Sequence, residues 1–181
     1  GRPAGWVTPD LTGTLDQRGL GSRTRGFNLP DPADREALGE DLARSGVYRS
    51  HHELFGVMPD VDQPVLARID RGALPLFGLV AAGVHLNGLV RTTDGLYLWT
   101  GRRAANKRLD PGKLDHLVAG GVPAGHTPWD ALLKEAAEEA SIQEDLAQQA
   151  QQVGRLVYAL DRPEGLRRDI LYCYDLFLPE S

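Results

Sequence analysis

Cysteine, methionine and long apolar runs are scarce in this chain, whose 181 residues include one cysteine and one methionine. The lone Cys173 cannot form a disulfide within the chain, which is typical of a reducing compartment and predicts the cytoplasm. No stretch approaches the roughly 20 apolar residues that span a membrane, and no charged and then apolar segment opens the chain as a signal peptide would. We therefore expect no membrane partner.

Positive charge is not in excess either, since the formal net charge is −5. A broad nucleic-acid surface needs clustered basic charge, so we expect no nucleic-acid partner, although a small phosphate pocket lined by arginines is still compatible with this charge. The hydrophobic content of 41% and the charged content of 25% are typical of globular proteins. The length suits one domain of ordinary size with an appendage.

The most informative segment of the sequence is residues 120–142, where a glycine-rich loop leads into a helix that carries Glu135, Glu138 and Glu139. Their spacing of i, i+3, i+4 places three carboxylates on one helical face, where exposed like charges repel by roughly 0.2–0.5 kcal/mol per pair. A divalent cation removes this repulsion, and magnesium prefers carboxylate oxygens. An ordinary amphipathic helix with a solvated acidic face is the alternative interpretation.

The start of this helix can be predicted residue by residue. Thr127 suits the N-cap, Pro128 then falls at the first helical position, and Asp130 at the third can complete a capping box. One apolar row should be buried, and it comprises Leu132, Leu133, Ala136, Ala137 and Ala140.

The whole segment resembles the Nudix box, whose pattern is Gly, five residues, Glu, seven residues, then Arg-Glu-aliphatic-any-Glu-Glu-any-Gly-aliphatic. Gly120 opens the match, and the three glutamates fall on the family's principal metal ligands. His126 replaces the first glutamate of the pattern, Lys134 the arginine, and Ser141 the late glycine. Lysine keeps the charge but not arginine's bidentate fork, and serine lacks glycine's freedom at positive φ.

A second and longer resemblance is to the thiamine-pyrophosphokinase-related branch of the Nudix hydrolases, and it covers the chain from about Val47 to about Pro179. It implies removal of a phosphate from damaged thiamine diphosphates such as oxythiamine diphosphate. Relatives continue past the end of this chain, so we expect a C-terminally truncated fragment or an unusual C-terminus. The phrases that carry the resemblance are Leu74–Gly78, Gly83–Gly88, Trp99–Arg103, Pro111–Gly125 and Gly165–Asp169.

The expected fold is α/β, a Nudix α/β/α sandwich with a mixed sheet over residues 79–181, preceded by an arm and a small α+β unit over residues 1–78. The arm, residues 1–30, has weak periodicity and is expected to be loose. A helix is predicted over 34–45 with Leu38 and Leu42 on one face. Strands are predicted over 52–57, 65–69, 84–92, 96–100, 114–119, 153–160 and 168–178, with hairpin turns at Asp94-Gly95 and 161–165.

The resemblance also implies roles for individual residues. Mg²⁺ (or Mn²⁺) would be held by Glu135, Glu138 and Glu139 with the backbone carbonyl of Ala119, and Lys134 would orient the carboxylates. Glu139 is our first choice for the general base and Glu164 the second. The substrate, a small-molecule diphosphate, would be contacted by some of Arg102, Arg103, Lys107, Lys113, His85 and His116.

Three alternatives stay open. The first is a Nudix hydrolase of nucleotide sugars or dinucleotides, which the box cannot distinguish from a thiamine diphosphate enzyme. The second is an enzyme similar to isopentenyl-diphosphate isomerase, which the surroundings of Arg102 favour, but the cysteine expected near Asp115 is absent. The third is a metal-free binding module that has kept the fold. A homodimer is compatible with each of them.

Overall fold

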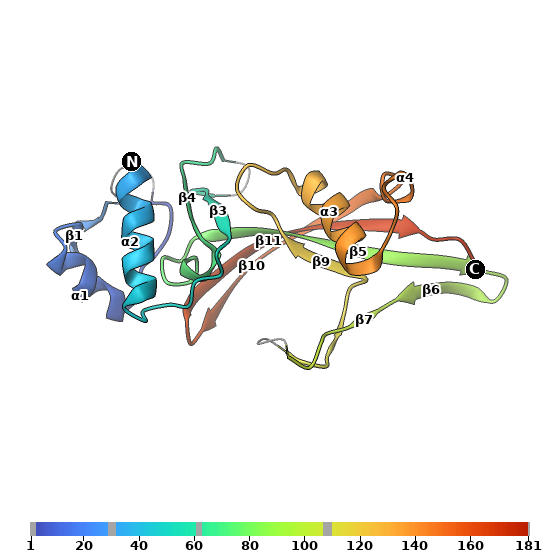
Figure 1. The fold of residues 1–181 in the computed structure, drawn as a ribbon, viewed down its shortest axis with the longest axis horizontal. Helices are drawn as coiled ribbons and strands as arrows, with labels where there is room; N and C mark the ends of the chain where they lie inside the picture. The colour runs from blue at the N-terminus through green and yellow to red at the C-terminus, as the bar shows by residue number, and fades with distance from the viewer. Residues whose placement is uncertain (1–2, 29–31, 61–62, 107–109, 181) are drawn as a thin grey trace. The chain divides into compact units, whose positions relative to one another are not determined.

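The computed structural model describes residues 3–28, 32–60, 63–106 and 110–180 (Figure 1). The chain divides into two compact units. The first comprises Gly1–Ala81, Pro123–Gly125 and Val157–Ile170, and the second comprises Ala82–Val122, His126–Leu156 and Leu171–Ser181. Lys107, a predicted phosphate-binding residue, lies outside the described residues.

The first unit contains two helices and short strands, and it also includes residues 79–81, 123–125 and 157–170, which lie beyond the predicted boundary at residue 78. The prediction of a loose N-terminal arm was wrong, because a helix forms there and buries Leu11 and Leu15. Among the helices of the described residues, none is long and apolar enough to cross a membrane. The elements are α1 (Pro9–Gln17), β1 (Gly21–Ser22), β2 (Gly26–Phe27), α2 (Pro32–Arg44), β3 (Leu54–Val57), β4 (Ala67–Asp70) and the 3₁₀ turn η1 (Arg71–Ala73).

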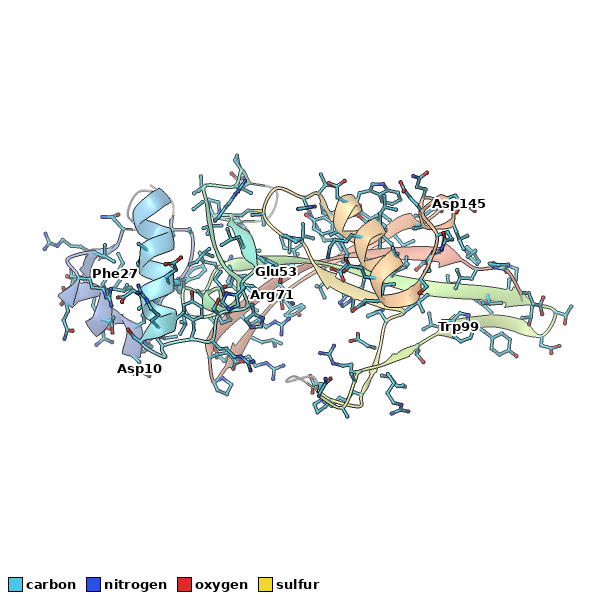
Figure 2. All side chains as sticks on the ribbon, viewed as in Figure 1. Asp10, Phe27, Glu53, Arg71, Trp99 and Asp145 are labelled. Carbon is cyan, nitrogen blue, oxygen red and sulfur yellow. The ribbon has the colours of Figure 1, made fainter. Side chains whose placement is uncertain are left out.

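The core of this unit forms where α2 meets the β3–β4 hairpin. Leu42 is fully buried and Leu38 nearly so, which confirms the predicted helical face. Val65 was predicted to lie in a strand but is exposed and precedes β4. At the surface of the hairpin, Arg71 and Glu53 lie side by side with 3.0 Å between Nη1 and Oε2 (Figure 2).

Five strands between Val80 and Phe177 form one sheet. Its strand order is β10-β11-β5-β6, and β9 also pairs with β5. The fold is therefore mixed α/β with a mixed sheet, as predicted. The strands are β5 (Val80–Thr92), β6 (Gly95–Trp99), β9 (Val118–Gly121), β10 (Gln151–Arg162) and β11 (Gly165–Phe177), and a separate two-stranded ladder joins β7 (Gly101–Arg102) and β8 (Leu114–Asp115).

Two predicted strand boundaries needed correction. The β5–β6 hairpin pairs Thr92 with Gly95, so the two loop residues are Thr93 and Asp94, one residue earlier than predicted. Residues 114–119 are not one strand, because β8 pairs with β7 whereas β9 pairs with β5. At the edge of the sheet, β6 leaves its large side chains, including Trp99, more than half exposed (Figure 2).

The core of the second unit forms between the sheet and helix α3 (Pro128–Ala140), which lies against β9 in Figure 1. Leu132 and Ala136 are fully buried there, as predicted. Ala137 is exposed, so the predicted widening of the apolar row at that position was wrong, and Ala131 is buried instead. The short helix α4 (Glu144–Ala147) follows and contacts α3.

Both ends of α3 follow from local sequence. The Thr127 side chain accepts a hydrogen bond from the Asp130 amide, and the Asp130 carboxylate accepts one from the Thr127 amide, which confirms the predicted capping box. At the other end, Ser141 adopts the left-handed conformation, with φ 54° and ψ 27°. A serine therefore occupies a position at which the Nudix pattern has glycine, and its Cβ makes this conformation unfavourable.

We expect Ser141→Gly to stabilise the second unit, because glycine adopts positive φ without a Cβ clash. The expected increase in the free energy of unfolding is about 1 kcal/mol. Urea denaturation followed by circular dichroism measures it. The control is Gly154→Ala, because Gly154 has no positive φ and nothing lies within 4 Å of the added methyl group. An unchanged urea midpoint for Ser141→Gly would contradict the prediction.

Candidate active site

The glycine-rich loop and α3 meet at one close contact. A Cβ built on Gly120 would lie 2.3 Å from Cγ and 2.5 Å from Cδ of Glu135. A side chain at position 120 would therefore displace this glutamate, whose own side chain is 17% exposed. We call this close contact between the loop and one carboxylate of α3 the Gly120 cradle.

Lys134 lies next to two of the three carboxylates of α3. Its Nζ is 3.0 Å from Glu138 Oε2 and 3.4 Å from Glu135 Oε1. The hydrogen bond with Glu138, followed by the charge of Glu135, raises the pKa of Lys134. Burial raises the pKa of the Glu135 carboxyl, Lys134 partly offsets this, and the charges of Glu139 and Glu138 add to the increase. Lys134 thus lies beside these two carboxylates, and its orienting role stays a prediction.

The third carboxylate binds the backbone of β9, since Glu139 Oε2 accepts a hydrogen bond of 3.0 Å from the Ala119 amide. Glu138, in contrast, is 58% exposed. Within the part of the chain that the structure describes, no three His, Cys, Asp or Glu side chains are gathered closely enough to hold a metal ion. The predicted ligand set of Glu135, Glu138, Glu139 and Ala119 therefore stays a prediction.

The residues nevertheless fit a hard divalent cation. The donor set consists of carboxylate oxygens spaced i, i+3 and i+4 on one face of a helix, and carboxylate oxygens are the ligands that magnesium prefers. Burial, together with the charges of Glu139 and Glu138, raises the pKa of Glu135 although Lys134 lies beside it. A cation beside Glu135 would compensate its negative charge, and the Gly120 cradle fixes where this carboxylate lies.

The predicted phosphate-binding residues of the basic loop have partners within the protein. Arg102 Nη1 donates to the Gly112 carbonyl at 2.8 Å, and Lys113 Nζ lies 2.5 Å from Asp110 Oδ1. Arg103 Nη1 forms an ion pair with Asp115 Oδ2 at 2.5 Å. These contacts link residues 102–103 with residues 112–115, and the predicted role of all three residues in substrate binding stays a prediction.

A polar cluster that the sequence only partly predicted lies across β5, β11 and the segment before β9. The rings of His85 and His116 are in contact, with their centroids 4.2 Å apart and their planes tilted by 31°. Asn87 Oδ1 is 2.9 Å from His116 Nδ1, and Asn87 Nδ2 donates to Asp175 Oδ1 at 2.8 Å. The two histidines were predicted, whereas Asn87 and Asp175 were missed. Their signal was alternation, since each polar residue lies between residues that face the core.

Two further residues with predicted properties can be placed. Glu164, our second choice for the general base, lies in the turn between β10 and β11. It belongs to the first unit whereas α3 belongs to the second, and its role as a base stays a prediction. Cys173 is half-buried, and burial followed by the charge of Asp175 raises the pKa of its thiol. A raised thiol pKa disfavours the thiolate, as expected for a cysteine that does not act as a nucleophile.

We expect Lys134→Met to lower activity and metal affinity by roughly tenfold to 100-fold, because partners that orient ligand carboxylates have effects of this size. Lys134→Arg should preserve or raise activity, because a guanidinium can bind both glutamates with fixed geometry. Steady-state kinetics together with magnesium titration measure both variants. If Lys134→Met were as active as the unaltered protein, the orienting role would be wrong.

Two curated relatives of this chain carry names from the Nudix hydrolase superfamily. The chain is 38% identical over 174 residues to Nudix hydrolase 20, chloroplastic, of Arabidopsis thaliana, covering 93% of this chain and 46% of that protein. It is 45% identical over 131 residues to Nudix hydrolase 24, chloroplastic, of the same plant, covering 72% and 36%. The chain thus spans less than half the length of these curated relatives. No family model matches it.

Among solved structures, DR0079 from Deinococcus radiodurans has a similar fold, with a TM-score of 0.50, 22% identity and coverage of 71% of this chain and 72% of that chain. This similarity concerns the fold alone. The names of the two plant proteins support the Nudix hydrolase superfamily for this chain, and they support a hydrolase. They give no substrate.

Proposed function

We propose that this chain is a magnesium-dependent hydrolase that cleaves a phosphoanhydride bond, the terminal one of a thiamine-diphosphate-like compound. The observation that carries the phosphoanhydride chemistry is the contact of Glu135 with Gly120 beside Glu138 and Glu139. A glycine that leaves space for one carboxylate, on a helical turn that carries two more, favours a site built for a cation over a solvated acidic face.

Within this proposal, Glu135, Glu138, Glu139 and the carbonyl of Ala119 would hold Mg²⁺ or Mn²⁺. The ion would supply positive charge against the phosphate oxygens and acidify a nearby water. Lys134 would keep the carboxylates of Glu135 and Glu138 in place. Glu139 Oε2 accepts from the Ala119 amide, which would orient Oε1 to accept the proton of the attacking water.

The proposed organic part of the substrate rests on the sequence segments that resemble the thiamine-pyrophosphokinase-related branch. The Nudix box does not indicate it. Arg103, Arg102 and Lys113 would bind the diphosphate, and His85 and His116 the ring system. A polar pocket discriminates strongly between an amino and an oxo group, because the wrong group leaves buried partners without hydrogen bonds. Damaged forms such as oxythiamine diphosphate are therefore the proposed preference.

The proposal also covers the cellular location and the partners of the protein. The single cysteine favours a reducing compartment, for which we propose the cytoplasm, although both plant relatives carry the word chloroplastic in their names. We propose neither a nucleic-acid nor a membrane partner. A homodimer stays compatible with the sequence, and sedimentation of the purified protein would decide it.

Hydrolysis of a panel of diphosphates with magnesium tests the proposal. The panel contains oxythiamine diphosphate, thiamine diphosphate, ADP-ribose and a nucleoside diphosphate, with phosphate and the organic product measured together. We expect the highest kcat/KM for oxythiamine diphosphate, with one phosphate and a monophosphate product. Preference for either nucleotide would support the nucleotide alternative.

Calorimetric titration with magnesium separates the enzyme from a metal-free binding module. We expect saturable magnesium binding that is abolished by replacing the glutamates of α3. Binding of a diphosphate without any magnesium binding would contradict the hydrolase proposal and favour the binding module.

A further inference from the structure

Three side chains of the second unit form a continuous chain of hydrogen bonds across the sheet. Asp175 on β11 accepts from Asn87 Nδ2 on β5 at 2.8 Å, and Asn87 Oδ1 lies 2.9 Å from Nδ1 of His116. Asn87 and Asp175 are separated by 88 positions in the sequence, so only the pairing of the strands brings them together.

The chemistry of the three groups fixes the direction of every bond in this chain. A carboxylate only accepts, so the amide of Asn87 must present its NH₂ group to Asp175. Its oxygen then faces His116, and an amide oxygen also only accepts. Nδ1 of His116 must therefore carry the proton, and in the neutral imidazole Nε2 is left as a hydrogen-bond acceptor.

The backbone of His116 is held as well as its ring. Its amide donates to Asp115 Oδ1 at 2.9 Å, and Asp115 Oδ2 is paired with Arg103. The ring of His85 packs against the imidazole of His116 at a tilt of 31°. The exposed His116 is thus held at its backbone, at Nδ1 and on one side of its ring, which is more order than a solvated histidine needs.

The position of this ring relates it to the candidate active site. On β5, Val84 and Leu86 belong to the core under α3, so His85 and Asn87 alternate to the other face of the sheet. His85 is the cross-strand partner of Ala119 in β9, and the Ala119 amide binds Glu139. His85 and Glu139 therefore both adjoin Ala119 of β9, His85 as its cross-strand partner and Glu139 through the hydrogen bond to its amide.

We propose that His116, held in its Nδ1–H form by Asn87 and Asp175, presents Nε2 as an acceptor to an N–H donor on the organic part of the substrate. Asn87 and Asp175 are then positioning residues that set the polarity of the contact. The inference rests on the proposed function for the nature of the substrate, a nitrogen heterocycle that carries a diphosphate. The exocyclic amino group of a pyrimidine, or the ring N–H of its oxo form, is a donor of the required kind.

Nitrogen-15 NMR of the histidine side chains tests the first half of this inference without any substrate. At about pH 8, where an ordinary imidazole is neutral, we expect His116 in the Nδ1–H form, whereas free histidine favours the proton on Nε2. Asn87→Ala should shift His116 towards the Nε2–H form, and Asp175→Asn should give a mixture, because the new amide no longer dictates the direction of the bonds.

The control for these variants is Cys173→Ala, on the same strand and the same face as Asp175, which should leave the tautomer of His116 unchanged. An Nε2–H form in the unaltered protein would overturn the inference and leave the proposed hydrolase untouched.

Ligand titration tests the second half without turnover. Thiamine monophosphate should shift the His116 Nε2 resonance saturably, and its analogue with hydrogen in place of the pyrimidine amino group should bind about tenfold more weakly. This difference should disappear in His116→Ala and shrink in Asn87→Ala. Equal binding of the two ligands by the unaltered protein would overturn the contact. Failure of every diphosphate to be hydrolysed, with the resonance shift intact, would instead contradict the proposed function alone.

Discussion

Glu138→Gln should lower hydrolysis by roughly 100-fold or more, because compensation of phosphate charge by a metal ion is worth several kcal/mol and about 1.4 kcal/mol corresponds to a factor of ten. Glutamine has the same size as glutamate but loses the charge and one anionic ligand oxygen. Since the side chain of Glu138 is 58% exposed, the fold should be unaffected. Steady-state kinetics with oxythiamine diphosphate and calorimetric titration with magnesium measure the two effects.

The matched control for this variant is Glu144→Gln. Glu144 lies on α4 and accepts a hydrogen bond from Gln148, which a glutamine could also accept. The control should keep full activity and magnesium affinity. Unaltered turnover in folded Glu138→Gln protein, together with unaltered magnesium binding, would remove Glu138 from the metal site.

Gly120→Ala should reduce magnesium affinity and turnover by roughly tenfold to 100-fold, as for other residues that orient metal ligands. The added methyl group would occupy the position 2.3 Å from Glu135 Cγ, so the glutamate has to leave its cradle. No charge is removed and no ligand is deleted. A loss of metal binding in this variant therefore reports on the position of the Glu135 carboxylate rather than on its presence.

Two comparisons make this result specific. Gly154→Ala introduces the same methyl group on β10, where nothing lies within 4 Å, and it should be neutral. The double variant Gly120→Ala with Glu135→Gln should be no worse than Glu135→Gln alone, since both changes act on one carboxylate. Additive losses would mean that the methyl group acts elsewhere in the loop, and a fully active Gly120→Ala would contradict the cradle.

The features that sequence predicted correctly are local. The capping box of Thr127 and Asp130 needs residues three apart, and the left-handed Ser141 follows directly from the end of the same helix. The place of Lys134 beside Glu135 and Glu138 follows from helical spacing. Strand boundaries were less accurate: the hairpin register was one residue off, because Gly95 pairs with Thr92 in the ladder and is not a loop residue.

The sequence by itself thus determined the carboxylate helix, its caps and the alternating strands, because these depend on contacts within a few residues. Only the tertiary structure decided the rest. The helix in the N-terminal arm depends on the burial of Leu11 and Leu15, for which weak periodicity gave no signal. The fit of Glu135 against Gly120, and the path from Asp175 through Asn87 to His116, need strands and a helix that are distant in sequence. Such contacts are fixed by strand register and by the packing of α3 on β9, and a short sequence pattern does not encode either one.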